Sequence, residues 1–127
     1  GLRGEPITVY GDGEQSRCFG HVKDVVECLT RLMACPEARG EVVNIGNDEE
    51  VTILQLAERV REMTGGKSEI VFIPYEKAYG EGFDDMRRRA PDLSKAKALV
   101  GYVPKRDLKT ILEDTIRYES EATVAAK

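Results

Sequence analysis

Short apolar runs typical of β-strands alternate along this chain with longer stretches that have the periodicity of amphipathic helices. The strand-like runs are residues 7–10, 15–19, 41–46 and 69–73. Helices are expected to begin near residues 22, 52, 92 and 107. This alternation predicts a small mixed α/β domain with short strands and about four helices. The run at 41–46, EVVNIG, is apolar enough to predict a strand buried in a sheet.

The helical stretches repeat apolar residues with the spacing of a single helix face. In the first stretch we expect the core-facing residues to be Val22, Val25, Val26, Leu29, Leu32 and Met33. Thr52, followed by Gln55, has the pattern of a capping box. Asp92 and Asp107 are expected to start the last two helices, because an Asp side chain accepts hydrogen bonds from the free N–H groups of a first turn. Residues 120–127 are expected to form a flexible tail.

Composition limits the functions open to the chain. Its 127 residues suit one domain with a core of its own. The formal net charge of -4 argues against a general nucleic-acid binder, which needs a basic face. No apolar run approaches the length of a membrane span. The 3 cysteines are too few for a disulfide framework, so a reducing, cytoplasmic location is expected.

The sequence offers few groups for catalysis. A single histidine and scattered cysteines do not supply a set of metal ligands. No Tyr is followed by a Lys four residues later, and no nucleophile has an evident base partner. His21, just before the first helix, is expected to be structural. Gly11-Asp12-Gly13 follows a strand, as a dinucleotide-binding loop would, but Ser16 stands at the third glycine position and no helix opens there.

Arginines close to aromatic residues are the clearest functional signal. Residues 87–89 are consecutive arginines that lie between a long loop and a short helix. A guanidinium held on a rigid element suits phosphate recognition, because arginine can bind a phosphate through two hydrogen bonds. Arg17, near Phe19, and the arginines at 87–89, near Phe83, could together hold a diphosphate. The alternative interpretation is that the acidic residues 84–85 form solvated surface pairs with residues 87–89.

Three runs, in order, resemble one protein family: ITVYGDGEQSRCFGHVKDVVECL, EVVNIGNDEEVTILQLAERV and RRRAPDLSKAKALVGYVPK. They are similar to the C-terminal part of extended short-chain dehydrogenase/reductases, which are NAD-dependent epimerases, dehydratases and decarboxylases of nucleotide sugars. Within that family, YGEGFDDMRRRAPD looks most like UDP-glucuronate decarboxylases and their close relatives. The resemblance implies that the chain is the C-terminal portion of a Rossmann-type enzyme, with residues 1–119 as its substrate-binding region.

The resemblance also implies roles for particular residues. Arg17, in the Gln-x-Arg-x-Phe segment, corresponds to an arginine that binds the nucleotide diphosphate. Arg89 corresponds to an arginine that lies near the sugar and phosphates and assists catalysis in some decarboxylases. Phe83 corresponds to an aromatic that contacts substrate and is Tyr in some members, so the role of that hydroxyl is in doubt here. Tyr10 and Gln15 are expected to contact the substrate too.

The family's glycine-rich NAD loop and its Tyr-x-x-x-Lys catalytic pair are not found in this sequence. We expect both to belong to an N-terminal Rossmann region that lies outside this chain, with residues 41–46 as the last strand of its sheet. The expected partners are that region and a UDP- or dTDP-sugar. The intact enzyme is expected to be a homodimer, and the fragment alone is expected to be inactive.

The resemblance leaves the reaction type, the sugar and the nucleotide base open. Two interpretations from other functional classes also stay open. One is a free-standing protein-interaction domain that uses an exposed edge strand. The other is a nucleotide-binding module that uses Arg17 and Arg89 without chemistry.

The chain is expected not to bind NAD measurably, because it has no glycine-rich loop at a helix N-terminus to hold the pyrophosphate. Calorimetric titration with NAD at millimolar concentration measures this. Saturable binding of NAD would contradict the interpretation of the chain as a substrate-binding fragment.

Overall fold

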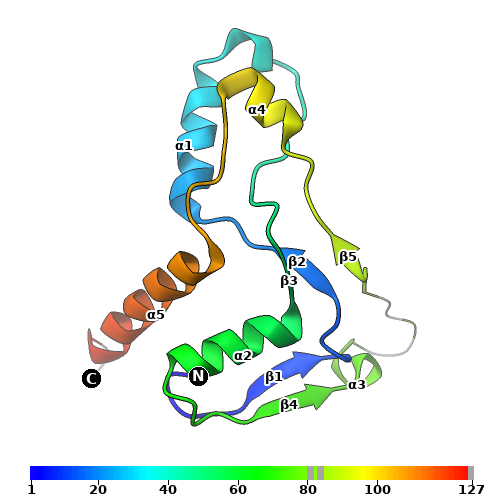
Figure 1. Cartoon of the computed structure of the whole chain (residues 1–127), viewed down its shortest axis with the longest axis vertical. Coiled ribbons are helices and arrows are strands. Elements are labelled where there is room, and N and C mark those ends of the chain that lie inside the picture. Colours follow the sequence, from blue (N-terminus) through cyan, green and yellow to red (C-terminus); the bar gives the residue numbers. More distant parts are fainter. Residues whose placement is uncertain (80–81, 83–84, 126–127) are drawn as a thin grey trace. The chain divides into compact units, whose positions relative to one another are not determined.

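The computed structural model describes residues 1–79, 82 and 85–125 (Figure 1). The chain divides into two compact units. Unit 1 comprises Gly1–Arg17, Val51–Arg89 and Leu112–Lys127, and unit 2 comprises Cys18–Glu50 and Ala90–Ile111. Mixed helices and short strands agree with the predicted α/β class, although the described residues contain five α-helices instead of about four.

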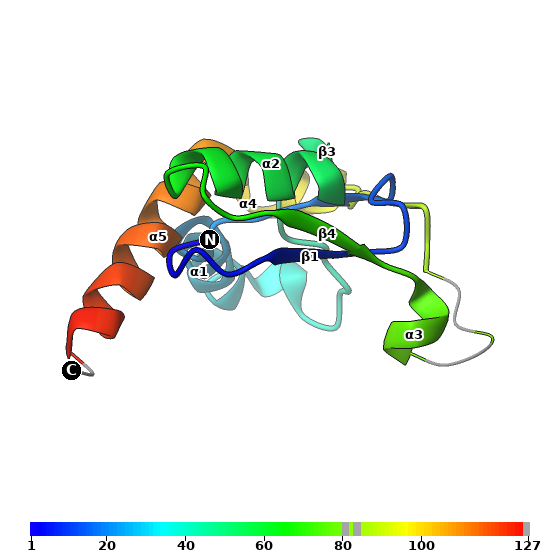
Figure 2. The same ribbon diagram turned by 90° about the horizontal axis from the view of Figure 1, so that it is seen from below.

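Unit 1 contains a parallel strand pair covered by a helix. Strand β1 (Ile7–Tyr10) pairs with β4 (Ile70–Ile73) in the register Ile7 opposite Ile70. Helix α2 (Ile53–Met63) lies along this pair, as Figure 2 shows. Val9 of β1 and Ala57 of α2 are buried where the two elements meet. Both predicted strands and the predicted helix are therefore confirmed.

A second sheet has three short strands in the order β3-β2-β5. It comprises β3 (Glu50–Thr52), β2 (Ser16–Cys18) and β5 (Arg88–Arg89). Strands β2 and β5 are parallel, with Ser16 opposite Arg88 and Arg17 opposite Arg89. The predicted loop at 75–91 is thus wrong in part, since it contains β5 and a short helix, α3 (Tyr75–Tyr79). Proline favours the start of a helix, and Pro74 accepts the first turn's hydrogen bond from Lys77.

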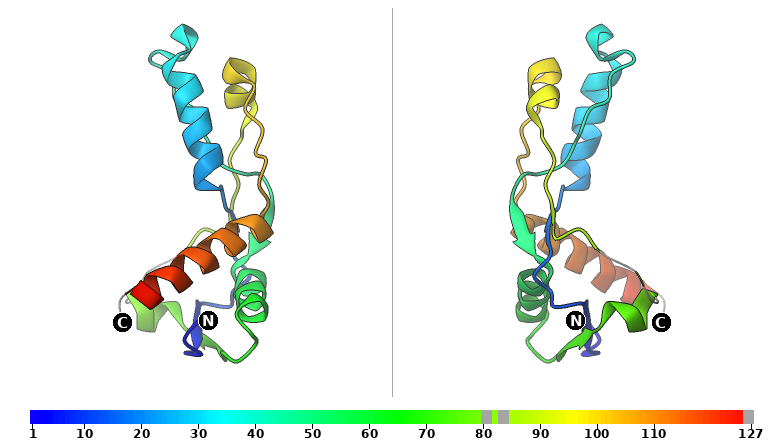
Figure 3. Two further views of the ribbon diagram at one scale, coloured as in Figure 1. Left: turned by 90° about the vertical axis from the view of Figure 1, so that its left-hand side faces the viewer. Right: turned by 90° about the vertical axis from the view of Figure 1, so that its right-hand side faces the viewer.

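Unit 2 is built around two helices that lie side by side in both views of Figure 3. These are α1 (Val22–Met33) and α4 (Ser94–Val100), and a 3-10 turn at Pro36–Ala38 follows α1. Cys28, Ala96 and Tyr102 form the buried centre, with Leu32, Val43, Ile45, Leu93 and Val100 packed against it. Leu93, Ala96 and Val100 have the spacing of one helix face, and that face packs on this core.

The helix caps agree closely with the sequence predictions. Thr52 and Gln55 form the predicted capping box. Asp107 accepts hydrogen bonds from the N–H and hydroxyl of Thr110 at the start of α5 (Leu108–Ala125). Asp92 accepts a bond from Ser94 N–H, but the N-cap position itself is Leu93.

One predicted boundary differs from the structure. The tail was predicted from residue 120, whereas α5 continues to Ala125. Alanine and glutamate are strong helix formers, and both occur in this final segment.

The strand predicted at residues 41–46 is not observed. Exposure alternates as in a strand, because Val43 and Ile45 pack on the core of unit 2 while Val42 is 84% exposed. A strand, however, requires a ladder partner. Within the described part of the chain, the backbone groups of Val42, Val43 and Ile45 bond to no other backbone group. The extended segment therefore has the side-chain pattern of a strand without its pairing.

Helix α1 has more apolar surface than unit 2 covers. The prediction that all six apolar residues face one core is wrong, since Val22, Val26, Leu29 and Met33 are 68%, 53%, 47% and 89% exposed. These residues are spaced by four, three and four positions, so they form a narrow stripe along the helix. The buried side is turned away from it and carries Asp24 and Cys28. We call Val22, Val26, Leu29 and Met33 the outer stripe of α1.

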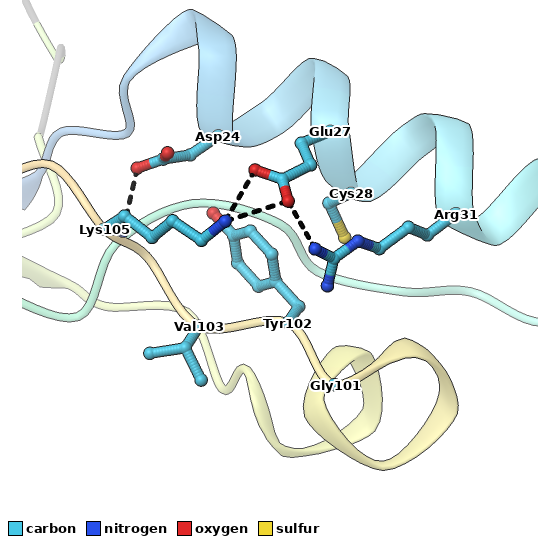
Figure 4. A pocket seen from close by; sticks show the side chains of 8 residues that line it. All are labelled: Asp24, Glu27, Cys28, Arg31, Gly101, Tyr102, Val103 and Lys105. Carbon is cyan, nitrogen blue, oxygen red and sulfur yellow. Dashed lines mark hydrogen bonds and ion pairs between the residues drawn. The ribbon is translucent and has the colours of Figure 1, made fainter.

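A buried carboxylate ties α1 to the segment that follows Tyr102 (Figure 4). Asp24 is 2% exposed, and its Oδ2 accepts bonds from the backbone N–H groups of Lys105 and Arg106, each at 3.0 Å. The Arg106 guanidinium pairs with Oδ1. Burial alone would raise the pKa of Asp24, but these three donors outweigh burial and hold the pKa below its usual value of 3.8. The neighbouring Glu27 pairs with Arg31 and Lys105 at the surface.

Replacing Asp24 by Ala is expected to lower the free energy of unfolding by about 3 kcal/mol, because it strands the donors that the buried carboxylate satisfies. Glu27→Ala is the control on the same helix and should cost less than about 1 kcal/mol, because that pair is exposed. Urea unfolding of both variants measures the difference. Equal losses would show that the Asp24 contacts add no stability beyond a surface pair.

The same carboxylate predicts a pH dependence. The folded pKa of Asp24 lies below the unfolded value of 3.8, so its contribution to stability is present above that pH and is lost as the pH falls through the lower folded pKa. The stability difference between the native chain and Asp24→Asn should therefore shrink below about pH 3.8. A difference that grows on acidification would contradict the direction of this pKa shift.

The outer stripe of α1 and the unpaired segment at 41–46 are expected to make the chain self-associate, because exposed apolar faces and unpaired edges invite contact. Leu29→Glu should shift light scattering of a dilution series toward the monomer. Thr30→Glu is the matched control, since it adds the same charge on the next, non-stripe position. A native chain that stays monomeric at all concentrations would disprove the prediction.

Candidate functional site

Unit 1 contains a cavity of about 350 Å³ next to β1, β2 and β5. Four of the sequence-predicted site residues line it, namely Tyr10, Gln15, Arg17 and Arg89. The other lining residues are Thr8, Ile53, Tyr75, Tyr79 and Asp85. The predicted residues thus meet at one place although Arg89 is more than 70 positions from the other three in sequence. Phe83, the remaining predicted residue, lies outside the described residues.

A tight turn brings the end of β1 round to β2. Gly11 has a φ of 71°, a conformation that favours glycine. A Cβ at this position would lie 2.4 Å from the Tyr75 ring, so only glycine lets the ring pack on the turn. Asp12 closes the turn by accepting a 3.0 Å bond from Glu14 N–H. The turn places Tyr10 and Gln15 beside the same cavity.

Gln15 presents a buried acceptor. The residue is 5% exposed, and its Nε2 donates to the Tyr10 carbonyl at 3.0 Å. Its Oε1 has no hydrogen-bond partner within the described part of the chain. Leaving a buried polar atom unsatisfied costs roughly 1–3 kcal/mol. A ligand N–H or O–H in the cavity would supply the missing donor.

Arg17 is held on three sides. Its side chain is 14% exposed. Nη1 donates to the carbonyls of Ser16 and Met86, at 2.7 and 2.8 Å. Nη2 pairs with Asp85 Oδ1 at 2.5 Å. Arg17 therefore reaches the cavity as a fixed guanidinium and not as a freely moving side chain.

Arg89, unlike Arg17, is exposed. It lies directly across from Arg17 in the parallel pairing of β2 and β5, so both side chains belong to the same face of the sheet. Arg89 is exposed, and its side chain forms no hydrogen bond or ion pair with the described residues. Its full set of donors is available at the cavity. One anchored and one available guanidinium thus converge on the same cavity.

Three tyrosines form an aromatic wall on this cavity. The ring of Tyr79 meets that of Tyr10 edge-on, with centroids 5.5 Å apart, and lies 6.3 Å from that of Tyr75. Tyr75 Oη donates to Asp85 Oδ2 at 3.3 Å. Burial first, and then the Asp85 carboxylate, raise the pKa of Tyr75 above its usual value of 10.0.

The other two arginines of the run occupy different places. Arg87 pairs with Asp12 at 2.7 Å, and both side chains are largely exposed. This pair borders a neighbouring cavity of about 180 Å³. Arg88 alternates with Arg89 along β5, so it belongs to the opposite face. Arg87 thus has a surface ion pair, and the partner seen among the described residues is Asp12 of the β1–β2 turn.

Asp85, Tyr75 and Tyr79 are site residues that sequence reasoning missed. Asp85 was expected only as a surface partner of residues 87–89, whereas it pairs with Arg17, 68 positions away. No local pattern links residues at that separation. The tyrosines were hidden because α3 was assigned to a loop, although Tyr75 and Tyr79 have the four-residue spacing of one helix face.

Other candidate chemistries have weaker support. His21 is 4% exposed, and its Nδ1 accepts from Lys23 N–H as the N-cap of α1, which fits the structural role. The described residues contain no group of His, Cys, Asp or Glu arranged to hold a metal ion. The 50 Å³ cavity beside Asp24 is too small for a substrate. Among the described helices, none combines the length and apolar character needed to cross a bilayer.

Comparison with known proteins adds an independent observation. Residues 2–115 match the sequence profile of the family described as GDP-mannose 4,6 dehydratase. The chain belongs to this family. It is therefore a member of the extended short-chain dehydrogenase/reductases, as the sequence predicted.

The relatives in this family act on nucleotide sugars. The chain is 42% identical over 119 residues to UDP-glucuronic acid decarboxylase 1 of Danio rerio, covering 94% of this chain and 27% of the relative. The UDP-glucose 4-epimerase structure from Thermotoga maritima, with UDP-glucose, has a TM-score of 0.82 at 34% identity, covering 96% of this chain and 37% of that one. MoeE5 in complex with UDP-glucuronic acid and NAD has a TM-score of 0.79 at 31% identity, covering 95% and 38%.

This chain spans well under half the length of these family members. The glycines of the β1–β2 turn do not fit NAD. Gly11 and Gly13 form a turn that leads into β2, whereas a pyrophosphate site needs a glycine-rich turn that opens a helix.

Proposed function

We propose that the 350 Å³ cavity of unit 1 binds the diphosphate of a nucleotide sugar. The chain would be the substrate-binding part of an NAD-dependent epimerase, dehydratase or decarboxylase. The observation that carries the proposal is the strand register that places Arg17 opposite Arg89 in β2 and β5, so that both arginines line one cavity. Gln15, whose Oε1 has no hydrogen-bond partner among the described residues, lines the same cavity.

Charge and geometry support a diphosphate as the ligand. Arg89 can grip a phosphate through two parallel N–H···O bonds, because its donors have no partner among the described residues. Arg17 adds a fixed positive charge with donors to spare beyond its three contacts. Two guanidinium groups that share a face repel each other, and a dianionic group between them removes this repulsion.

The remaining lining residues suit the rest of a nucleotide sugar. The Tyr10 and Tyr79 rings are partly exposed and offer an apolar face with polar edges. Gln15 Oε1 would accept from a hydroxyl or an imino N–H of the ligand. The relatives named above include a structure with UDP-glucose and one with UDP-glucuronic acid, which supports a UDP-sugar.

For the intact protein we propose NAD as the cofactor, bound by an N-terminal region outside this chain. The cofactor would supply hydride-transfer chemistry there, and the residues in this chain would bind and orient the sugar diphosphate. Arg89, which has no partner among the described residues, would lie nearer the reacting sugar than Arg17 and assist the chemistry. The resemblance to UDP-glucuronic acid decarboxylase 1 favours decarboxylation, and by family resemblance the intact enzyme would be a homodimer.

Replacing Arg17 or Arg89 by Ala is expected to weaken UDP binding by about 10- to 150-fold, because each guanidinium supplies charge-assisted bonds worth roughly 1.5–3 kcal/mol. The effect should be measurable by calorimetry on this chain, since all the residues lining the cavity lie in unit 1. Lys should restore only part of the loss, because an ammonium cannot make the planar two-point contact.

Arg87→Ala and Arg88→Ala are the controls, one for a surface pair and one for the opposite face of β5. Each should change the Kd for UDP less than fivefold, which corresponds to less than about 1 kcal/mol. Circular dichroism establishes that each variant is folded. Unchanged UDP binding by folded Arg17→Ala and Arg89→Ala would rule out the diphosphate site.

A further inference from the structure

We propose that Asp85 is a positioning residue, which fixes the Arg17 guanidinium for the diphosphate and ties it to the tyrosine wall of the cavity. The proposal rests on the proposed function of this cavity. It assigns to Asp85 a role that acts through Arg17 and involves no direct contact with the ligand.

The contacts of Asp85 join two elements of unit 1. Its Oδ1 accepts from Arg17 Nη2 on β2 at 2.5 Å, and its Oδ2 accepts from Tyr75 Oη on α3 at 3.3 Å. Met86, the next residue, accepts from Arg17 Nη1 through its carbonyl. Residues 85–86 thus hold both terminal nitrogens of the same guanidinium. Small movements of Asp85 would be passed directly to Arg17.

The arginine keeps donors for a ligand while it is held in this way. A guanidinium has five N–H donors, and the three contacts to Ser16, Met86 and Asp85 use three of them. The remaining two are engaged by no described residue. A phosphate can therefore bind Arg17 without displacing Asp85, which distinguishes positioning from competition between two anions.

The negative charge of Asp85 also contributes to holding Arg17. Arg17 and Arg89 are neighbours on one face of the sheet, and nothing among the described residues neutralises Arg89. The Asp85 carboxylate pairs with the Arg17 guanidinium and holds it in place without occupying the Arg89 donors. An Asn at this position would keep the shape and lose the charge.

The test is a double-mutant cycle on this chain, with UDP as the probe and the Kd from calorimetry as the readout. Asp85→Asn is expected to weaken UDP binding about 5- to 20-fold. Combined with Arg17→Ala it should cause no further loss, because Asp85 acts only through Arg17. Tyr75→Phe should weaken binding less than Asp85→Asn, since it removes only the contact to the second oxygen.

Asp12→Asn is the matched control, because it breaks the exposed pair with Arg87 by the same chemical change. It should leave the Kd for UDP within about twofold. If Asp85→Asn does not fold by circular dichroism, Asp85→Glu replaces it. That variant keeps the charge and displaces the carboxylate by one methylene, so it should also weaken binding severalfold.

The possible outcomes separate this proposal from the proposed function. Tighter UDP binding by Asp85→Asn would show that Asp85 competes with the phosphate, which overturns the positioning role. Unchanged UDP binding by Asp85→Asn, together with weakened binding by Arg17→Ala, would show that the carbonyls of Ser16 and Met86 are enough to hold Arg17. That result would also overturn the positioning role. If the native chain and Arg89→Ala are equally unable to bind UDP, the proposed function itself fails, and the inference fails with it.

Discussion

The parallel pairing of β2 with β5 is the contact on which the candidate site depends. A single register places Arg17 opposite Arg89, and the backbone bond from Ser16 N–H to the Arg87 carbonyl, at 2.8 Å, holds that register. Successive residues of a strand point to opposite faces, so a slip by one position would present Arg88 in place of Arg89. A strand of two residues therefore decides which of three consecutive arginines reaches the cavity.

Two carboxylates fasten distant segments of the chain, and they do so in different ways. Asp24, in unit 2, is almost fully buried and is satisfied by two backbone N–H groups and one guanidinium. Such a group contributes to stability mainly because its loss leaves buried donors unpaired. Asp85, in unit 1, is partly exposed and has one guanidinium and one phenol as partners. Its contacts hold the Arg17 side chain at the cavity, so we expect Asp85 to affect the geometry of the site more than the stability of the fold.

The apolar surface that unit 2 leaves uncovered fits the length of the relatives. The outer stripe of α1 and the unpaired backbone at 41–46 would be costly on a finished protein surface. The related structures are chains more than twice as long as the part matched here. The N-terminal region proposed for the intact enzyme would be a partner for the extended segment.

Local pattern alone determined several features of this protein. The spacing of apolar residues located α1 and α2, Thr52 with Gln55 fixed the capping box, and the β-branched runs located β1 and β4. These predictions are correct because hydrogen bonds and side-chain periodicity within a few residues define helices, strands and helix caps. The resemblance of the arginine segments to a known family also indicated Arg17 and Arg89 as candidate site residues, and both line the cavity.

Tertiary structure decided what depends on contacts between distant residues. Whether 41–46 is a strand depends on a partner for its backbone, and the sequence of the segment does not contain that partner. Which side of α1 is buried depends on where Ala96 and Tyr102 pack, because the helix is apolar on more than one face. The pairing of Asp85 with Arg17 and Tyr75 arises only when β2, β5 and α3 meet. Sequence patterns act over a few residues, whereas these contacts join segments 10 to 69 positions apart.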